Sequence, residues 1–243
     1  MRVLNLGCGA KASSSPEVIN IDWSILVRLK KSPLLRPIAP IFLTGERLQR
    51  FTSLPDNIVL HDLSKGIPFD SNSVDAVYHS HLLEHLDRNI AEGFLLEVRR
   101  VLKPNGIQRI VVPDLEKLCK DYLSHIVACD EDPKKGAAHE TFISAIIEQS
   151  VRKEAYATRL QSPLRRFFVN LLVGDARKRG ETHQWMYDRI SLSELLISLG
   201  YRNIQLHGYD TSQIPNWGMY GLDVEAMACM QYKPGSLYVE AQK

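Results

Sequence analysis

The sequence predicts an α/β protein built on a doubly wound, mostly parallel sheet of seven strands. Short apolar runs rich in Val, Ile and Leu are bounded by Gly, Pro, Asp or Asn, as expected for strands buried on both faces. Amphipathic helical patterns lie between several of these runs. The predicted strands are Arg2–Leu6, Val18–Ile21, Ile58–Leu60, Val74–Tyr78, Ile107–Val112, Ile204–Tyr209 and Leu237–Ala241.

Two amphipathic segments are the clearest helices. Ser191–Leu199 carries leucines at helical spacing and is followed by Gly200, a natural left-handed cap. The other helix precedes Lys103-Pro104-Asn105-Gly106, where Pro and Asn-Gly should end it in a turn. Its apolar stripe should face the core and consists of Ile90, Phe94, Leu95, Val98, Val101 and Leu102.

Composition and length favour one globular domain over residues 1–243. Of the 243 residues, 44% are hydrophobic, enough for a real core, yet no apolar run is long enough to cross a membrane. The first residues lack the features of a secretory leader. The cysteines Cys8, Cys119, Cys129 and Cys229 are scattered, without a Cys-x-x-Cys pair. We therefore expect reduced thiols, a cytoplasmic location and no metal site.

Two stretches, at about 25–55 and 115–182, interrupt the alternation of strands and helices and are interpreted as insertions. Both are basic: Ile25–Phe51 holds six basic residues and one acidic residue, and Arg152–Arg179 holds eight and two. Basic and apolar residues together suit a lid over an anionic acceptor, or a surface that rests on an anionic membrane. The same composition is also expected if the apolar residues complete the core and the charged residues simply face water. Of the two functional interpretations, we favour the lid.

A glycine-rich turn follows the first predicted strand. Val3–Leu6 runs directly into Gly7-Cys8-Gly9, and glycines at a strand-to-helix turn let a ligand approach the backbone closely. The dinucleotide fingerprint needs a third glycine, but Ala10, Lys11 and Ala12 follow instead. A nicotinamide cofactor is therefore disfavoured.

Acidic and polar residues follow the next three strands. Asp22 ends the second strand, where a carboxylate can bind a ribose diol or cap a helix. Asp62 follows the third strand and can accept a bond from an adenine amino group. The fourth strand ends in His79-Ser80-His81. The carboxyl ends of strands are the edge at which open α/β sheets bind ligands.

These elements, in this order, resemble the class I S-adenosylmethionine (SAM)-dependent methyltransferases. The resemblance includes the glycine turn, Asp22, Asp62, Asp75–His81 and Val101–Gly106. Pro68–Val77 with His81–Leu86 looks like a subgroup of small methyltransferases associated with cell-surface polysaccharide synthesis, which carry a Leu-Glu-His signature. The resemblance is strong from Arg2 to about Asp114 and looser from His183 onward.

The resemblance implies a Rossmann-like methyltransferase fold and transfer of a methyl group from SAM to an oxygen or nitrogen, leaving S-adenosylhomocysteine. Relatives usually carry Asp or Glu at the position of Asn5, which here brings no charge to the methionine amino group. The implied acceptor is a small molecule or a sugar, including anionic or lipid-linked forms, with peripheral membrane contact as an option. The cofactor-binding residues it implies are Asn5, Gly7, Gly9, Asp22, Asp62, Leu63 and His79.

Two histidines are the candidate proton acceptors: His81, after the fourth strand, and His183, before the last helix. General-base catalysis of this kind is worth roughly 10²–10⁴-fold. His81 can instead cap a helix, and His81 with His85 at i, i+4 offers only two metal ligands. The candidate acceptor-binding residues are Glu84, His85, Asp114, Trp185 and Tyr187, of which Trp185 and Tyr187 are alternatively core residues.

Two other functions are considered. Amino-directed nucleic-acid methyltransferases carry Asn/Asp-Pro-Pro-aromatic where this chain has His79-Ser80-His81-Leu82, and C5-directed enzymes carry a cysteine where it has Val112-Pro113-Asp114. Basic segments can still bind phosphates, but we expect no nucleic-acid partner. Because of Asn5, a non-catalytic SAM-binding module is the other alternative. The sequence does not indicate an oligomeric state.

Overall fold

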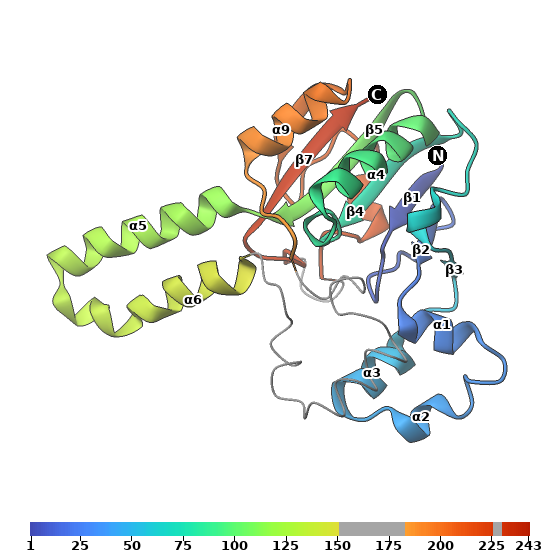
Figure 1. The fold of residues 1–243 in the computed structure, drawn as a ribbon, viewed down its shortest axis with the longest axis horizontal. Coiled ribbons are helices and arrows are strands. Elements are labelled where there is room, and N and C mark those ends of the chain that lie inside the picture. Colours follow the sequence, from blue (N-terminus) through green and yellow to red (C-terminus); the bar gives the residue numbers. More distant parts are fainter. Residues whose placement is uncertain (151–182, 226–229) are drawn as a thin grey trace.

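The computed structural model describes residues 1–150, 183–225 and 230–243, and it contains a seven-stranded sheet (Figure 1). The strand order is β3-β2-β1-β4-β5-β7-β6. Only β7 runs antiparallel to its neighbours, β5 and β6. The predicted fold class is confirmed. The strands are β1 (Val3–Leu6), β2 (Val18–Asp22), β3 (Ile58–Leu60), β4 (Val74–Ser80), β5 (Leu102–Pro113), β6 (Arg202–His207) and β7 (Ser236–Gln242).

Helices connect most of these strands, and none that the structure describes is both long and apolar enough to span a membrane. The basic segment Arg152–Arg179 lies outside the described residues. The α-helices are α1 (Ile25–Lys31), α2 (Ala39–Phe42), α3 (Gly45–Ser53), α4 (Arg88–Val101), α5 (Leu115–Glu131), α6 (His139–Gln149) and α9 (Arg189–Ser198). The 3-10 helices are η1 (Leu63–Lys65), η2 (Leu83–His85), η3 (Pro133–Ala138) and η4 (Trp217–Tyr220).

One face of the sheet is covered by α4 and α9, which share a core with β1, β4 and β5. Asp188 begins α9 with a capping box, and Gly200 follows that helix with a φ of +83°. The prediction that Ile90 faces the core is wrong, because Ile90 is 56% exposed. The buried stripe of α4 instead starts at Ala91, about 100° further around the helix.

Two local predictions near the strands are also wrong. No helix follows the glycine turn, since the chain passes from β1 to β2 through a loop. The segment Lys103–Gly106 does not form a separate turn after α4. It lies within β5, and Asn105 adopts a φ of +64° beside a register shift in the β4–β5 pairing.

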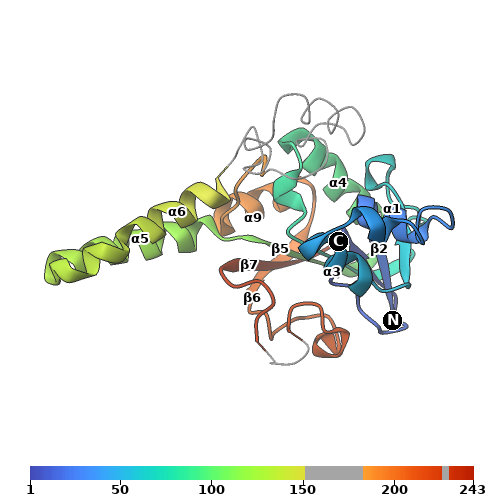
Figure 2. The ribbon, with the colours of Figure 1, turned by 90° about the horizontal axis from the view of Figure 1, so that it is seen from below.

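The segment after β6, which contains η4, packs on the opposite face of the sheet (Figure 2). A buried ionic network lies beneath it. Arg109 is fully buried on β5, donates to Asp223 at 2.8 Å and Glu240 at 2.7 Å, and also donates to two backbone carbonyls. Tyr78 and Trp217 donate to the same Asp223 carboxylate. The network ties the segment after β6 to the sheet.

The α5–α6 hairpin extends away from the sheet (Figures 1 and 2). It begins directly after β5, and neither of its two helices contains a buried residue. Among the described residues, its two helices contact mainly each other and η3.

Candidate functional site

For a sheet of this strand order, a ligand-binding crevice is expected at the carboxyl ends of β1 and β4. The strand order reverses at β1, which pairs with β2 on one side and β4 on the other. In open α/β sheets, such a switch point is where ligands bind. Gly7 and Gly9, just after β1, adopt φ values of +64° and +52°. These left-handed conformations favour glycine and explain why the turn contains two.

Asp22 holds the glycine turn in place. Its carboxylate accepts bonds from the backbone N–H of Gly9 at 2.8 Å and of Ser24 at 2.6 Å. A carboxylate can accept about four hydrogen bonds, so these two leave capacity for a ribose diol. Burial, followed by the nearby Asp22 charge, raises the pKa of the Cys8 thiol well above its usual range. The Cys8 thiol therefore stays protonated near neutral pH.

Open space lies beside Gly9. A Cβ atom built on Gly9 would meet no atom within 4 Å, whereas one on Gly7 would lie 3.1 Å from the Leu82 side chain. The turn thus presents bare backbone on one side and is packed on the other. This geometry fits a cofactor that approaches the backbone at Gly9.

Asn5 and His79 lie in the interior, below the crevice. Asn5 is 1% exposed, and its amide donates to the Lys11 carbonyl and to Asn20 Oδ1, both at 3.0 Å. His79 is fully buried, 2.9 Å from the Gln108 amide and edge-on to the Phe94 ring. Both side chains serve internal contacts in this structure.

Asp62 and Leu63 lie at the start of η1, after β3. The Asp62 carboxylate accepts from the N–H and the hydroxyl of Ser64, at 3.1 and 2.7 Å. The hydroxyl bond lowers the pKa of Asp62, which stays ionised near neutral pH. Leu63 is half-buried against the core. Both lie at the same edge of the sheet as Asp22, because β3 runs parallel to β2.

Two neighbouring titratable groups, His81 and Glu84, follow β4 at the edge where the acceptor is predicted to bind. His81 follows β4 with a left-handed φ of +50°, its Nε2 lies 2.8 Å from Ser236 Oγ, and its Nδ1 lies 3.3 Å from Glu84 Oε1. Neither Glu84 oxygen, both buried, has a hydrogen-bond partner in the described part of the chain. Burial raises the pKa of Glu84 to about 8. Burial, with the Lys233 charge second, lowers the pKa of His81 to about 3. Both groups are therefore neutral at pH 7.

His183 lies beside η2 because the two residues that follow it hydrogen-bond to that helix. The N–H groups of Gln184 and Trp185 donate to the Glu84 carbonyl at 2.7 and 3.2 Å. The His183 ring packs edge-on against His85, with centroids 4.7 Å apart. Its Nδ1 lies 2.9 Å from the Gln149 carbonyl, at the end of α6. A carbonyl only accepts, so His183 carries its hydrogen on Nδ1 and keeps the lone pair of its neutral form on Nε2.

The other predicted acceptor residues surround this group. Tyr187 is 3% exposed, and its buried hydroxyl has no partner among the described residues. Burial, with the neighbouring Glu84 second, raises the pKa of Tyr187 to about 12. Trp185 is 39% exposed beneath the Arg88 guanidinium. Asp114 caps α5 through the Lys117 N–H.

Some contacts of this site have no signal in the sequence. Ser236 on β7 and Gln149 on α6 reach His81 and His183 from far along the chain. The ligand atoms of Glu84, His85 and His183 also lie within 4.8 Å of one another, near enough to hold a metal ion. A metal-binding measurement therefore belongs with any test of the histidines.

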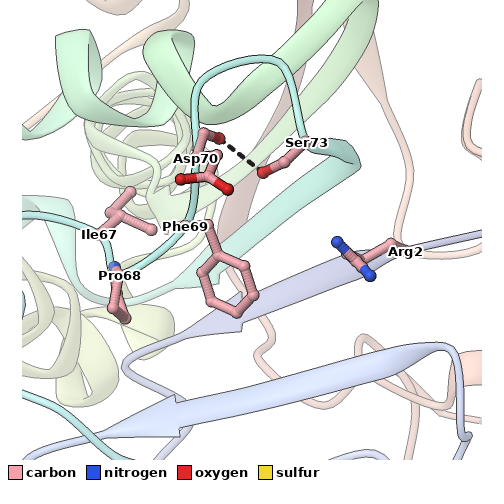
Figure 3. A pocket seen from close by; sticks show the side chains of 6 residues that line it. All are labelled: Arg2, Ile67, Pro68, Phe69, Asp70 and Ser73. Carbon is pink, nitrogen blue, oxygen red and sulfur yellow. Dashed lines mark hydrogen bonds between the residues drawn. The ribbon is translucent and has the colours of Figure 1, made fainter.

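A hollow of about 380 Å³ lies elsewhere (Figure 3). Arg2 precedes β1 and Ser73 precedes β4, so the hollow opens at the amino ends of the strands, away from the crevice. Ligands of open α/β sheets bind at the carboxyl ends, so we do not assign this hollow to the cofactor. Its lining residues are Arg2, Ile67, Pro68, Phe69, Asp70 and Ser73.

Comparison with known proteins indicates the activity and the cofactor. Residues 4–110, from β1 into β5, match the family model of a methyltransferase domain. Together with the strand order and the bare glycine turn, this match indicates a SAM-dependent methyltransferase with SAM as its cofactor. No protein of the curated set matches it.

Solved structures also resemble the chain. A SAM-dependent methyltransferase from Archaeoglobus fulgidus is 15% identical, with a TM-score of 0.43 over 100% of this chain and 86% of that one. Another, from Methanosarcina mazei, is 16% identical, with a TM-score of 0.43 over 100% and 92%. DhpI in complex with SAH is 15% identical, with a TM-score of 0.46 over 99% and 75%.

Proposed function

We propose that this methyltransferase acts on an oxygen or nitrogen of a small-molecule or glycan-type acceptor, with His183 as the proton acceptor. The observation that carries the proposal is the bond between His183 Nδ1 and the Gln149 carbonyl, which reserves the lone pair on Nε2. Gly7, Gly9, Asp22 and Asp62 would hold SAM, which supplies an activated methyl group. Alignment of the acceptor supplies much of the remaining effect.

His81 is the weaker of the two predicted bases. Both of its ring nitrogens have neighbours, Ser236 and Glu84, and its pKa of about 3 makes it a poor proton acceptor at pH 7. Glu84 is buried with Oε1 3.3 Å from His81 Nδ1, and we assign both residues to positioning the acceptor. His85, Trp185, Tyr187 and Asp114 would complete the acceptor side, with Trp185 offering an exposed ring to a sugar.

The test compares wild type with His183→Gln, whose amide can still donate to the Gln149 carbonyl but has no basic nitrogen. The probes are nucleotide-linked sugars and lipid-linked sugars, with RNA and DNA as competing acceptors, and methylation is detected by mass spectrometry. We expect turnover on a sugar probe to fall roughly 10²–10⁴-fold with unchanged SAM affinity by calorimetry. Full activity in His183→Gln would refute the base. Metal binding by wild type that is lost in His183→Gln would assign the histidines to a metal instead.

The first basic segment supports an anionic or lipid-linked acceptor. Leu34, Ile41 and Phe42 are 81%, 75% and 79% exposed around α2, amid the basic residues of this segment. The apolar residues at these positions therefore do not complete the core. We infer that this surface meets an anionic partner at the membrane, consistent with the resemblance to enzymes of polysaccharide synthesis.

Vesicle sedimentation tests this inference. Wild type should bind vesicles of phosphatidylglycerol more than vesicles of phosphatidylcholine, and salt should weaken binding because charges are screened within about 8–10 Å. Phe42→Asp should reduce binding, while Met219→Asp, at an equally exposed position on η4, should not. Equal vesicle binding by the Phe42→Asp and Met219→Asp variants would count against membrane contact. A cytoplasmic location stays a prediction.

A further inference from the structure

A second group of metal-ligating side chains lies on the α5–α6 hairpin, outside the crevice. His125 and Cys129 are four residues apart on α5 and share one face. His139 is the first residue of α6, across the turn formed by η3. The Nδ1 atoms of His125 and His139 are 3.0 Å apart, and Cys129 Sγ lies 3.5 Å from His125 Nδ1. All three residues are half-buried, with their ligand atoms within 4.8 Å of one another.

These separations are near those of a tetrahedral metal centre. Zinc lies about 2.0–2.1 Å from imidazole nitrogen and about 2.3 Å from thiolate sulfur, so tetrahedral geometry places two nitrogens about 3.4 Å apart and a nitrogen and a sulfur about 3.6 Å apart. The separations of His125 from His139 and from Cys129 need shifts of only a few tenths of an ångström, and the Cys129–His139 separation lies within 4.8 Å. Aromatic neighbours fix both rings: His125 stacks on Phe142 at 4.1 Å, and His139 lies 5.4 Å from Tyr122.

We propose that His125, Cys129 and His139 form a binding site for a zinc-type transition-metal ion. Imidazole and thiolate together favour zinc and its neighbours over magnesium or calcium, which prefer oxygen ligands. Three protein ligands from the described residues leave one tetrahedral position for water. A hydrogen-bonded His–His–Cys group without metal is the competing explanation.

The position of this site gives it a structural consequence. Neither α5 nor α6 buries a residue, so an ion bound by both would join the two helices near their turn. The far end of α6 carries Gln149, whose carbonyl contacts His183. The metal would thus fix a hairpin that reaches the acceptor side of the crevice. The site does not depend on the methyl-transfer proposal.

Cobalt titration of the full-length chain tests the site. We expect about one Co²⁺ per chain, strong visible absorption typical of tetrahedral coordination, a thiolate-to-cobalt charge-transfer band, and displacement by Zn²⁺ but not Mg²⁺. Cys129→Ser should remove the charge-transfer band and weaken Zn²⁺ binding at least about tenfold. The matched control is Cys119→Ser, an exposed cysteine on the same helix, which should change nothing.

His139→Ala removes a second ligand and should likewise change the cobalt spectrum and weaken Zn²⁺ binding. Circular dichroism checks that each variant folds. His183→Gln separates this site from the Glu84, His85 and His183 group and should keep the cobalt spectrum. Three results would overturn the proposal: no cobalt uptake by wild type, an unchanged spectrum in folded Cys129→Ser or His139→Ala, or loss of the spectrum in His183→Gln.

Discussion

The buried carboxyl of Glu84 makes the folding stability depend on pH in a defined direction. Burial raises its pKa from an ordinary value of 4.5 to about 8, so the folded chain holds this proton more tightly than the unfolded chain. The resulting stability is fully present below about pH 4.5 and is lost as pH rises through about 8. At about 1.36 kcal/mol for each pKa unit, the full loss is roughly 5 kcal/mol. That is a large fraction of a typical total stability of about 5–15 kcal/mol.

Glu84→Gln tests this because it keeps the shape of the protonated acid and cannot ionise. Urea unfolding at about pH 5 and about pH 9 gives the free energy of unfolding of each variant. Wild type should lose stability relative to Glu84→Gln between these pH values, by roughly 3–5 kcal/mol. His81, whose lowered pKa costs stability only as pH falls from about 6.5 towards 3, is present in both proteins and largely cancels.

The matched control is Glu194→Gln, which replaces an exposed carboxylate on α9 and should follow the pH dependence of wild type. A difference between wild type and Glu84→Gln that stays constant from about pH 5 to about pH 9 would refute the reasoning. In that case Glu84 would ionise in the folded chain without penalty, and the neutral pairing with His81 would be wrong.

Three further predictions concern the cofactor turn and the buried network. Gly9→Val should lower SAM affinity about tenfold or more in calorimetry, because it strains a φ of +52° by about 1–2 kcal/mol and fills the open space, while Ala10→Val should not. Asp22→Ala should lower it roughly 10–100-fold, and unchanged affinity in that folded variant would remove Asp22 from the site. Arg109→Met should cost about 3–5 kcal/mol in urea unfolding, since it leaves Asp223 and Glu240 buried without their cation; wild-type stability would show that the network is replaceable.

Short-range patterns predicted most of the fold. All seven strands were visible because a strand in a covered sheet is a short apolar run with turn residues at both ends. The errors lie where contacts with residues distant in the sequence determine the local structure. Leu102 pairs with Val74 of β4 and β5 extends back to the end of α4, so the expected turn is absorbed into the strand. Ile90 has the right spacing for the core stripe but lies just beyond its edge, at the exposed first turn of α4.

The candidate site could also be predicted only in part, because some of its contacts come from residues distant in the sequence. His81, Glu84 and His85 follow one strand and lie close in sequence, so a local pattern identifies them. The contacts that give them distinct roles come from Ser236 and Gln149, which no local pattern links to them. The hairpin cluster is similar: His125 and Cys129 show helical spacing, but His139 joins them only through the turn between α5 and α6.

Glu84 connects the two halves of the acceptor side in two different ways. Its backbone carbonyl accepts from Gln184 and Trp185 and so positions His183, while its side chain faces His81. Because the side chain is neutral at pH 7, the first connection does not depend on its charge. Glu84→Gln should therefore leave His183 in place and affect turnover far less than His183→Gln. If Glu84→Gln instead abolished turnover in a folded protein, the proton would pass through Glu84, and His183 would only position the acceptor.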